Sequence, residues 1–392
     1  MLSNLDQQPA DALLALIKLH NDDPRGDKID LGVGVYRTGQ GSTPVFGAIK
    51  AAEQVLIDTQ NSKSYLGPEG DMGFVHALMP YIFGVDDPTM SGRIEGMQAP
   101  GGTGAVRIAV ALAKKAGVER IWMGLPSWPN HAQILGDLGV ELKSFTHATK
   151  IGTTDMDALR VAIGLAQPGD AIMLHGCCHN PTGIDYSNAK WDEIARLVAA
   201  AQLLPILDLA YQGLGHGMEE DAYGLRQVLA AVPEALIAYS CDKNFGMYRD
   251  RVGAIYVMAA DDAVLNRVLS NGHALARAAW SMPPDHGGAA VRIILEDPGL
   301  TALWLDELET MRVRMRQVRA RLGEVGQAGA IDLTPIALQN GLFSVLPLSP
   351  EQILKLRQDH GIYLAGSGRI NIAGLTTDNI DKFIADLAAV TG

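Results

Sequence analysis

Cysteine is scarce in this chain of 392 residues, which has only three: Cys177, Cys178 and Cys241. Two of them are adjacent, and none has the spacing of metal ligands or of a disulfide framework. Cysteine is often simply buried in the core. We therefore expect three reduced core residues, and we expect no metal site.

Basic residues are also fewer than acidic ones. The chain has 32 lysines and arginines and 44 aspartates and glutamates, which gives a net charge of −12. Such a surface disfavours binding to nucleic acid or to an anionic membrane, since both require a basic field. No apolar run approaches the roughly 18 residues that a membrane helix needs. The N-terminus is polar and typical of an amphipathic helix rather than a signal peptide. These features predict a cytoplasmic protein with no nucleic-acid or membrane partner.

Short apolar runs alternate with helical patterns between residues 100 and 260. The predicted strands are RIWMGLP, AIMLHGC, LPILDLAY, ALIAYSC and RVGAIYVMA. Runs of this kind, separated by helices, are typical of strands buried on both faces of a mostly parallel sheet. The sequence therefore predicts an α/β fold with a sheet flanked by helices. In such sheets, ligands bind at the carboxyl ends of the strands.

The length favours one large domain with a smaller one. A long helical pattern from about Thr301 to Leu322 could connect the two. It is followed by a strand-like run, a helix with Ser349 as N-cap and Pro350 at its first position, a second strand-like run and a final helix. We predict an N-terminal arm with part of the small domain at 1–45, the large domain at 46–310 and a small α+β domain at 311–392.

Two turns at the ends of predicted strands could contribute to a ligand site. The turn GGTGA leads directly into a helix that Gly117 closes, and the unpaired N–H groups at such a start can hold a phosphate. Glycine-rich turns also precede helices for steric reasons alone. Asn180 lies before a Pro-Thr-Gly turn, where it could simply hydrogen-bond its own backbone.

Two more segments carry ionisable groups at strand ends. Asp208 ends an apolar strand, with Tyr211 three residues later. A buried carboxylate needs a cationic partner, either a structural Arg or Lys or the protonated ring nitrogen of a ligand. Lys243 lies between Ser240 and Arg251, as expected of a lysine that binds a phosphorylated aldehyde covalently. A solvated loop lysine is the more frequent outcome for this stretch alone, but together the four segments provide what pyridoxal 5'-phosphate requires.

The ordered motifs of the chain resemble those of the aspartate and aromatic amino-acid aminotransferases, which are pyridoxal-phosphate enzymes of fold type I. These motifs are LGVGVY, YLGPEG, GGTGA, SWPNH, HNPTG, DLAYQG, SCDKNFGMYRDR and GRINIAG. LHGCCHNPTG and SMPP resemble the bacterial aromatic enzymes more than the strict aspartate enzymes. The resemblance implies a seven-stranded type of sheet in the large domain and a smaller α+β domain.

The activity that the resemblance implies is a ping-pong transfer of an amino group between an amino acid, aspartate, glutamate or aromatic, and a 2-oxo acid such as 2-oxoglutarate. The alternatives are a strict aspartate aminotransferase and a pyridoxal-phosphate-dependent lyase or decarboxylase on the same scaffold. A ligand-sensing regulator is a third alternative, which the acidic composition disfavours.

The resemblance also implies roles for individual residues. Lys243 would bind the cofactor covalently and move a proton at the substrate Cα. Asp208 would keep the pyridine nitrogen protonated, and Tyr211 and Asn180 would donate hydrogen bonds to the phenolic oxygen. Trp128 would stack on the ring, and Trp128 and Asn180 would also contact the substrate.

The cofactor phosphate would be held by donors suited to a dianion. These are the backbone N–H groups of Gly102 and Thr103 and the side chains of Ser240 and Arg251. The resemblance further implies that His131 and His179 support the residues in contact with the cofactor.

Substrate binding is implied for two arginines. Arg369 would hold the α-carboxylate, although a surface ion pair would be the default for this residue alone. Arg277 would pair with a side-chain carboxylate. Arg277 and the cofactor-binding Tyr65 would come from the neighbouring subunit, which implies a homodimer with shared active sites. Gly34 would lie in the segment that closes over the substrate, unless it is a plain turn glycine.

Two positions depart from the family pattern. Asp242 stands where relatives commonly have a small hydroxyl residue, and a carboxylate about 5 Å from a phosphate would be repelled by roughly 3 kcal/mol. Either Asp242 turns toward Arg249 or another cation, or the affinity for the cofactor is reduced. Met282 stands where aspartate-specific relatives usually have Asn, and a thioether favours an apolar pocket. We therefore expect aromatic substrates alongside dicarboxylates.

Overall fold

The computed structural model describes residues 2–7, 12–84, 92–149 and 152–392. The chain divides into two compact units. The small unit comprises Met1–Thr43, Met315–Leu338 and Leu342–Gly392, and the large unit comprises Pro44–Arg314 and Gln339–Gly341. The domain boundaries derived from the sequence stay a prediction.

The large unit contains a seven-stranded sheet with the strand order β2-β8-β7-β6-β5-β3-β4. The strands are β2 (Ile94–Pro100), β3 (Arg120–Leu125), β4 (Glu141–Thr146), β5 (Ala171–His175), β6 (Leu204–Leu209), β7 (Ala235–Ser240) and β8 (Val252–Met258). Neighbours from β4 to β7 pair in parallel, whereas β8 is antiparallel to both β7 and β2. This arrangement confirms the predicted α/β fold with a mostly parallel sheet.

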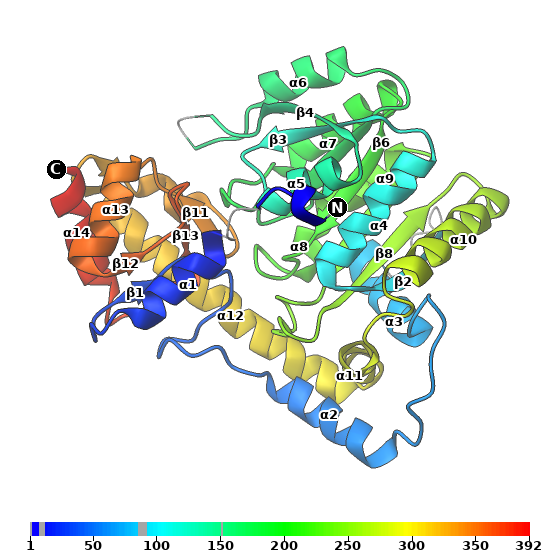
Figure 1. The fold of residues 1–392 in the computed structure, drawn as a ribbon, viewed down its shortest axis with the longest axis horizontal. Helices are drawn as coiled ribbons and strands as arrows, with labels where there is room; N and C mark the ends of the chain where they lie inside the picture. The colour runs from blue at the N-terminus through cyan, green and yellow to red at the C-terminus, as the bar shows by residue number, and fades with distance from the viewer. Residues whose placement is uncertain (1, 8–11, 85–91, 150–151) are drawn as a thin grey trace. The chain divides into compact units, whose positions relative to one another are not determined.

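Helices cover the sheet of the large unit (Figure 1). They are α2 (Gly47–Thr59), α3 (Met72–Phe83), α4 (Gly101–Lys115), α5 (Pro129–Asp137), α6 (Met156–Leu165), α7 (Asn188–Ala200), α8 (Met218–Asp221), α9 (Tyr223–Ala231), α10 (Asp262–Ala279), α11 (Asp285–Glu296) and the first part of α12 (Pro298–Val325). Each parallel crossover passes through at least one of these helices, as parallel strands require.

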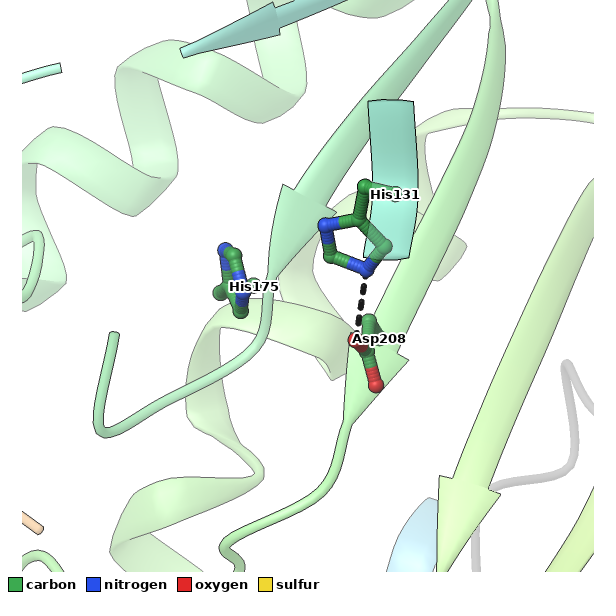
Figure 2. Close-up of side chains that lie close together, drawn as sticks. All are labelled: His131, His175 and Asp208. Carbon is green, nitrogen blue, oxygen red and sulfur yellow. Dashed lines mark hydrogen bonds and ion pairs between the residues drawn. The ribbon is translucent and has the colours of Figure 1, made fainter. Parts of the chain in front are cut away.

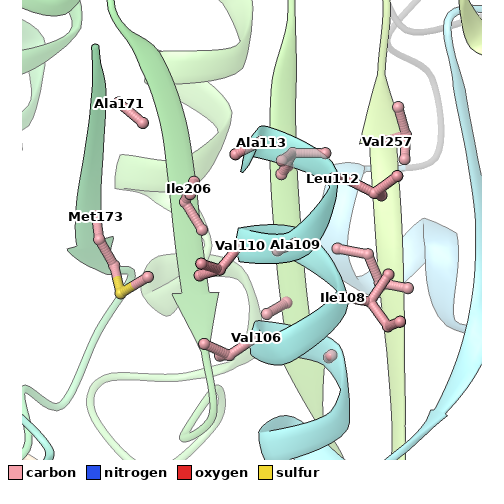
Figure 3. Packing of buried hydrophobic residues seen from close by; sticks show 14 of the residues in the cluster. Val106, Ile108, Ala109, Val110, Leu112, Ala113, Ala171, Met173, Ile206 and Val257 are labelled. Atoms are coloured by element: carbon pink, nitrogen blue, oxygen red, sulfur yellow. The ribbon is translucent and has the colours of Figure 1, made fainter. Parts of the chain in front are cut away.

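Helix α4 lies in the middle of this core. Val106, Ile108 and Val110 are at most 2% exposed and belong to one hydrophobic cluster. Figure 3 shows them beside Ile206 of β6 and Val257 of β8. Burying one such side chain stabilises the fold by about 1.5–3 kcal/mol. Because β2 leads directly into α4, this packing fixes the start of α4 at the edge of the sheet where β6 and β7 end.

The small unit has its own core and three two-stranded sheets. Its strands are β1 (Ile29–Asp30), β9 (Gln327–Ala328), β10 (Ile331–Asp332), β11 (Phe343–Val345), β12 (Ile362–Tyr363) and β13 (Arg369–Asn371). Its helices are η1 (Leu2–Asn4), α1 (Ala12–Asp22), η2 (Thr334–Leu338), α13 (Pro350–His360), η3 (Ile372–Gly374), α14 (Ile380–Thr391) and the end of α12. Residues 8–11 of the predicted N-terminal helix lie outside the described residues.

Local sequence signals explain the start of α13. The Ser349 side chain accepts a hydrogen bond from the Gln352 N–H, and the Gln352 side chain accepts one from the Ser349 N–H. This capping box satisfies two donors that a helix start leaves unpaired. Pro350 occupies the first helical position, as predicted.

Two further sequence features can be placed on the fold. The three cysteines are buried, and the described part of the chain contains no disulfide. Within that part, no helix is both long enough and apolar enough to cross a membrane.

Candidate active site

The ends of three neighbouring parallel strands form one edge of the large unit's sheet. His175 at the end of β5 is in register with Asp208 of β6. Ser240 ends β7 and pairs with Gly253 of β8. The loops that follow these strands carry Asn180, Tyr211 and Lys243. The structure therefore gathers three of the four predicted segments at the carboxyl edge of the sheet, where open α/β sheets bind ligands.

Asp208 is buried and pairs with a histidine of helix α5. Its Oδ2 lies 2.9 Å from His131 Nε2 (Figure 2). On the other side of the same ring, His131 Nδ1 lies 3.0 Å from Ser127 Oγ. Burial acts to raise the pKa of Asp208, but the hydrogen bond from His131 and the nearby His175 and Lys243 outweigh it and lower the pKa. The carboxyl group is therefore ionised at neutral pH.

His175 lies beside this pair, and sequence reasoning missed it. Its ring centroid is 5.0 Å from that of His131, and its buried Nε2 has no hydrogen-bond partner among the described residues. Burial, with the charge of His131, lowers the pKa of His175 to about 3. The residue is therefore a neutral imidazole at physiological pH. The one sequence signal that could have found it is its position at the end of the run AIMLH.

Two clusters of the described residues have side chains close enough to share a metal ion. One is His131, His175 and Asp208, and the other is Cys177, Cys178 and Asp221. In the first, Asp208 already binds His131. In the second, Asp221 accepts hydrogen bonds from the N–H groups of Gly213, Gly215 and His216. Burial raises the pKa of Cys177 well above its usual value, so its thiol stays protonated. The second donor set therefore does not fit a metal ion, which needs deprotonated ligands with available lone pairs.

Lys243 lies in the turn after β7, and its Nζ is 5.2 Å from the centre of the Tyr211 ring. Burial lowers the pKa of Lys243, although Asp242 and Asp208 partly oppose this effect. A lowered pKa leaves more of the amine neutral, which makes it a better nucleophile and base. Asn180 Nδ2 donates to the Tyr211 hydroxyl at 3.1 Å. The structure thus brings four predicted residues together: Lys243, Asp208, Tyr211 and Asn180.

Buried polar contacts hold the lysine turn in place. Asn244 Nδ2 donates to the Tyr239 hydroxyl at 2.9 Å, and Trp304 Nε1 donates to the Asn244 carbonyl at 2.8 Å. Phe245 stacks on Trp304 with ring centroids 4.3 Å apart. Asn244 and Phe245, the two residues that follow Lys243, are fixed by this packing, so the turn is held by β7 on one side and by α12 on the other.

A second set of contacts positions Asn180. The Asp185 carboxylate accepts hydrogen bonds from the N–H groups of Cys178 and His179, both at 2.9 Å. Thr182 Oγ lies 2.8 Å from His179 Nδ1, and His179 stacks on the His147 ring with centroids 3.5 Å apart. These contacts fix the loop after β5, which is the supporting position expected for His179.

The start of α4, Ser240 and Arg251 form a cradle. Gly101 has a φ of +66°, and a Cβ added there would lie 2.5 Å from Arg251 Nη2. A Cβ added at Gly102 would lie 3.0 Å from Ser240 Cβ. The N–H groups of the first turn, which includes Thr103, lack partners within a helix and lie at the positive end of its dipole. Glycine at both positions leaves room for an anion against the backbone.

Asp242 reaches into this cradle. It is 2% exposed, it is ion-paired with Arg251 Nη1, and it accepts a hydrogen bond from the Val252 N–H at 3.2 Å. The sequence left open a turn toward Arg249 or another cation, and the cation is Arg251. Arg249 is instead exposed.

Three other predicted residues of the large unit lie at its surface or near it. Trp128 is the N-cap of α5, and its ring lies edge-on to His131, with centroids 5.1 Å apart. Tyr65 is 91% exposed. Arg277 is also exposed and donates to Ser281 Oγ at 2.5 Å. Within this chain, neither Tyr65 nor Arg277 joins the buried residues around Lys243.

The remaining two predicted residues belong to the small unit. The Arg369 guanidinium lies over the Phe343 ring, 4.4 Å from its centre, and donates to the Gly32 carbonyl at 3.0 Å. A Cβ added at Gly34 would lie 2.7 Å from the same Phe343 ring. Asn371 Nδ2 donates to the carbonyls of Val33 and Val35, which fixes the segment around Gly34. The small unit thus gathers Gly34 and Arg369 around Phe343.

Comparisons with known proteins show which family the chain belongs to. A family model described as aminotransferase class I and II matches residues 26–387. The chain is 50% identical over 378 residues to a tyrosine aminotransferase of Rhizobium meliloti (strain 1021), covering 96% of this chain and 97% of the relative. It is 41% identical over 395 residues to an aspartate aminotransferase of Escherichia coli (strain K12), covering all of both chains.

A solved structure agrees with these relatives. The aromatic-amino-acid aminotransferase from Burkholderia pseudomallei, covalently bound to pyridoxal phosphate, superposes with a TM-score of 0.96 at 35% identity, covering 100% of both chains. The resemblance inferred from the motifs is confirmed. The chain belongs to the class I and II aminotransferases, a family of enzymes that depend on pyridoxal 5'-phosphate.

Proposed function

We propose that this aminotransferase exchanges the amino group of aspartate, glutamate and aromatic amino acids with a 2-oxo acid such as 2-oxoglutarate, by a ping-pong mechanism. The observation that carries the proposal is a lysine of lowered pKa, Lys243, held beside Tyr211 and near the ionised carboxylate of Asp208. No finding favours a lyase or a decarboxylase. A cytoplasmic location stays a prediction from composition.

The residues around Lys243 fit the cofactor of the family. The second carboxylate oxygen of Asp208 has no hydrogen-bond partner among the described residues, and an ionised carboxylate suits a protonated ring nitrogen. Tyr211 and Asn180, already joined by a hydrogen bond, would face the phenolic oxygen. When bound, pyridoxal phosphate supplies a conjugated ring that accepts electrons released at the substrate Cα.

The remaining contacts follow from the positions of the side chains. Trp128 would cover the ring, since it lies against the histidine that holds Asp208. The backbone of Gly102 and Thr103, with Ser240 and Arg251, would hold the phosphate.

Lys243 is proposed to move the proton at the substrate Cα. Burial lowers its pKa, so a larger fraction of the amine is neutral and able to accept a proton at physiological pH. The Asp208–His131 pair holds a fixed negative charge in a buried place, which costs no reorganisation during the reaction.

Substrate recognition is proposed for residues of both units. Arg369 would bind the α-carboxylate in the planar fork that a guanidinium offers, with Gly34 in the segment that contacts the substrate. Arg277 would bind a side-chain carboxylate, and Trp128 and Asn180 would also contact the substrate. The exposure of Arg277 and Tyr65 supports a homodimer in which the neighbouring subunit uses them.

The catalytic proposal is tested by Lys243→Ala, with Lys115→Ala as a matched change of an exposed lysine. Turnover of aspartate with 2-oxoglutarate should fall by at least roughly 10²-fold in the first variant, because a positioned general base contributes about 10²–10⁴-fold. The second variant should keep the parental rate. A Lys243→Ala enzyme as fast as its parent would contradict the proposal.

The substrate proposal is tested by kcat/KM for aspartate, phenylalanine and tyrosine, each with 2-oxoglutarate. We expect all three to be used, as the tyrosine and aspartate relatives suggest. Met282→Asn should shift the preference toward aspartate, because it replaces a half-buried thioether with a polar amide. A preference for aspartate above about 10⁴-fold in the parent enzyme would exclude the aromatic substrates, since only a paired polar contact gives such discrimination.

A further inference from the structure

Asp242 occupies the position from which a cofactor phosphate would be contacted. It is ion-paired with Arg251, which is the only guanidinium of the proposed phosphate cradle among the described residues. A Cβ added at Gly101 would lie 2.9 Å from Asp242 Oδ2 and 2.5 Å from Arg251 Nη2. The carboxylate, the guanidinium and the start of α4 therefore meet at one point.

The Asp242 carboxylate already accepts hydrogen bonds from two of the donors at this point. One is Arg251 Nη1, and the other is the Val252 N–H. Arg251 Nη1 also donates to the Tyr248 carbonyl at 3.1 Å. A phosphate placed at the start of α4 would compete with Asp242 for Arg251, and the two anions would repel each other in a poorly solvated place.

The charged and titratable groups that face Asp242 come from several elements. Arg251 precedes β8, Lys243 and Cys241 flank Asp242 in the turn, and the positive end of α4 lies opposite. Burial raises the pKa of Asp242, in spite of the favourable charges of Lys243 and Arg251. The Cys241 thiol stays neutral, because burial raises its pKa well above the usual value.

We propose that Asp242 determines the affinity for the cofactor by competing with its phosphate for Arg251, so that phosphate binding breaks the Asp242–Arg251 pair and is accompanied by uptake of one proton. The inference rests on the proposed function, which assigns the phosphate to this cradle. The proton goes to the Asp242 carboxylate, which then donates a hydrogen bond instead of repelling the dianion. The ligand class is a phosphate monoester. The affinity for the unphosphorylated aldehyde does not depend on Asp242.

The test measures the dissociation constant of pyridoxal 5'-phosphate. The cofactor is removed from purified full-length protein, and rebinding is followed by equilibrium dialysis and by quenching of tryptophan fluorescence. The variants are Asp242→Asn and Asp242→Ser, and the matched control is Asp250→Asn, which removes a carboxylate from the same segment and leaves the Asp242–Arg251 pair in place. Thermal unfolding of each protein without cofactor shows that it is folded.

We expect Asp242→Asn and Asp242→Ser to bind pyridoxal 5'-phosphate at least about tenfold more tightly than the parent, because one buried negative charge beside the dianion is removed. Asp250→Asn should change the dissociation constant by less than about threefold. Pyridoxal, which lacks the phosphate, should bind the parent and both Asp242 variants equally.

The pH dependence separates competition from simple repulsion. Because the bound phosphate raises the pKa of Asp242 further, the bound state holds the extra proton, and the affinity of the parent should fall as pH rises through that pKa. The ratio of the parent and Asp242→Asn dissociation constants should therefore be smallest near about pH 6 and grow toward about pH 8.5.

Three results would overturn the proposal. The first is weaker binding in both Asp242 variants, which would mean that Asp242 orients Arg251 toward the phosphate. The second is a ratio that does not change with pH, and the third is an equal gain for pyridoxal. Failure of the proposed function is distinguishable, because then neither the parent nor the variants would bind pyridoxal 5'-phosphate at all, whatever stands at position 242.

Discussion

At the scale of residues, the buried groups around Asp208 show how neighbours set the charge of a site. Asp208 and His131 form a buried pair, so the carboxylate stays ionised although burial opposes it. His175, whose Nε2 has no hydrogen-bond partner in the part of the chain that the structure describes, is kept neutral by the same burial. The environment lowers both pKa values for different reasons, because the hydrogen bond from His131 and nearby charges lower that of Asp208, whereas burial lowers that of His175.

The pKa of His175 predicts a pH dependence of stability. Its folded pKa of about 3 lies below the unfolded value of 6.5, so between these values the unfolded state binds a proton that the folded state does not. The free energy of unfolding should therefore fall as pH drops through this window, by up to about 1.4 kcal/mol per pH unit from this residue. In the His175→Gln protein, this contribution to the slope of the free energy of unfolding against pH should be absent. Denaturant unfolding from about pH 4.5 to pH 7.5 measures that slope.

The control for His175 is His76→Gln, which changes an exposed histidine. The slope of its free energy of unfolding against pH should match that of the parent protein. If His175→Gln and the parent showed the same slope, the buried imidazole would have to be protonated in the folded state or accessible to water.

At the scale of elements, helix α4 connects the core to the cradle. Its apolar residues pack against the face of the sheet that β6, β7 and β8 form (Figure 3). Its first turn carries the glycines next to Ser240 and Arg251. The helix propensity of glycine is poor, and two of them at the start of a helix would be costly in isolation. Packing of the later turns compensates for this cost, so that small residues can lie where the anion needs room.

We predict that Ile108→Ala destabilises the protein by about 2–5 kcal/mol, because it leaves a cavity in a cluster that cannot collapse freely. Lys115→Ala, at the exposed end of the same helix, should change the free energy of unfolding by less than about 0.5 kcal/mol. Chemical denaturation of both variants measures the difference. Equal stabilities would show that α4 does not contribute to the cooperative core.

At the scale of the whole molecule, the site needs more than one chain in our proposal. Tyr65 is 91% exposed and Arg277 is exposed, which is unusual for residues expected to bind cofactor and substrate. In our proposal, the second subunit uses both residues, which explains why they are exposed in the single chain. A homodimer with two-fold symmetry would place each of these residues against the other subunit's site.

This prediction can be tested by mixing two inactive proteins. Lys243→Ala and Arg277→Ala homodimers should each be poor with aspartate, but after unfolding and refolding together the mixture should regain about a quarter of the parental activity. Half of the dimers would then be mixed, and each would contain one intact site. If Arg277 served its own chain, no mixed dimer would contain an intact site and activity would not return. Each variant refolded alone gives the baseline.

Much of the fold and of the candidate site could be predicted from local sequence. Five strands were visible as apolar runs, but β2 and β4 were not. The segment IEGMQAP of β2 contains Gly, Gln and Pro, and β4 lies at the edge of the sheet with only Phe145 buried, so neither has a continuous apolar pattern. Lys243, Ser240 and Arg251 were found together because they are close in the chain.

By itself, the sequence determined the α/β class, the strand ends that carry Asp208 and Lys243, and the membership of the aminotransferase family. Only the tertiary structure decided that Asp242 pairs with Arg251 rather than Arg249, and that His175 lies beside His131. The physical reason is that patterns along the chain record which faces are buried, whereas ion pairs and pKa values depend on distances between side chains from separate elements. Those distances exist only once the strands and α4 are packed.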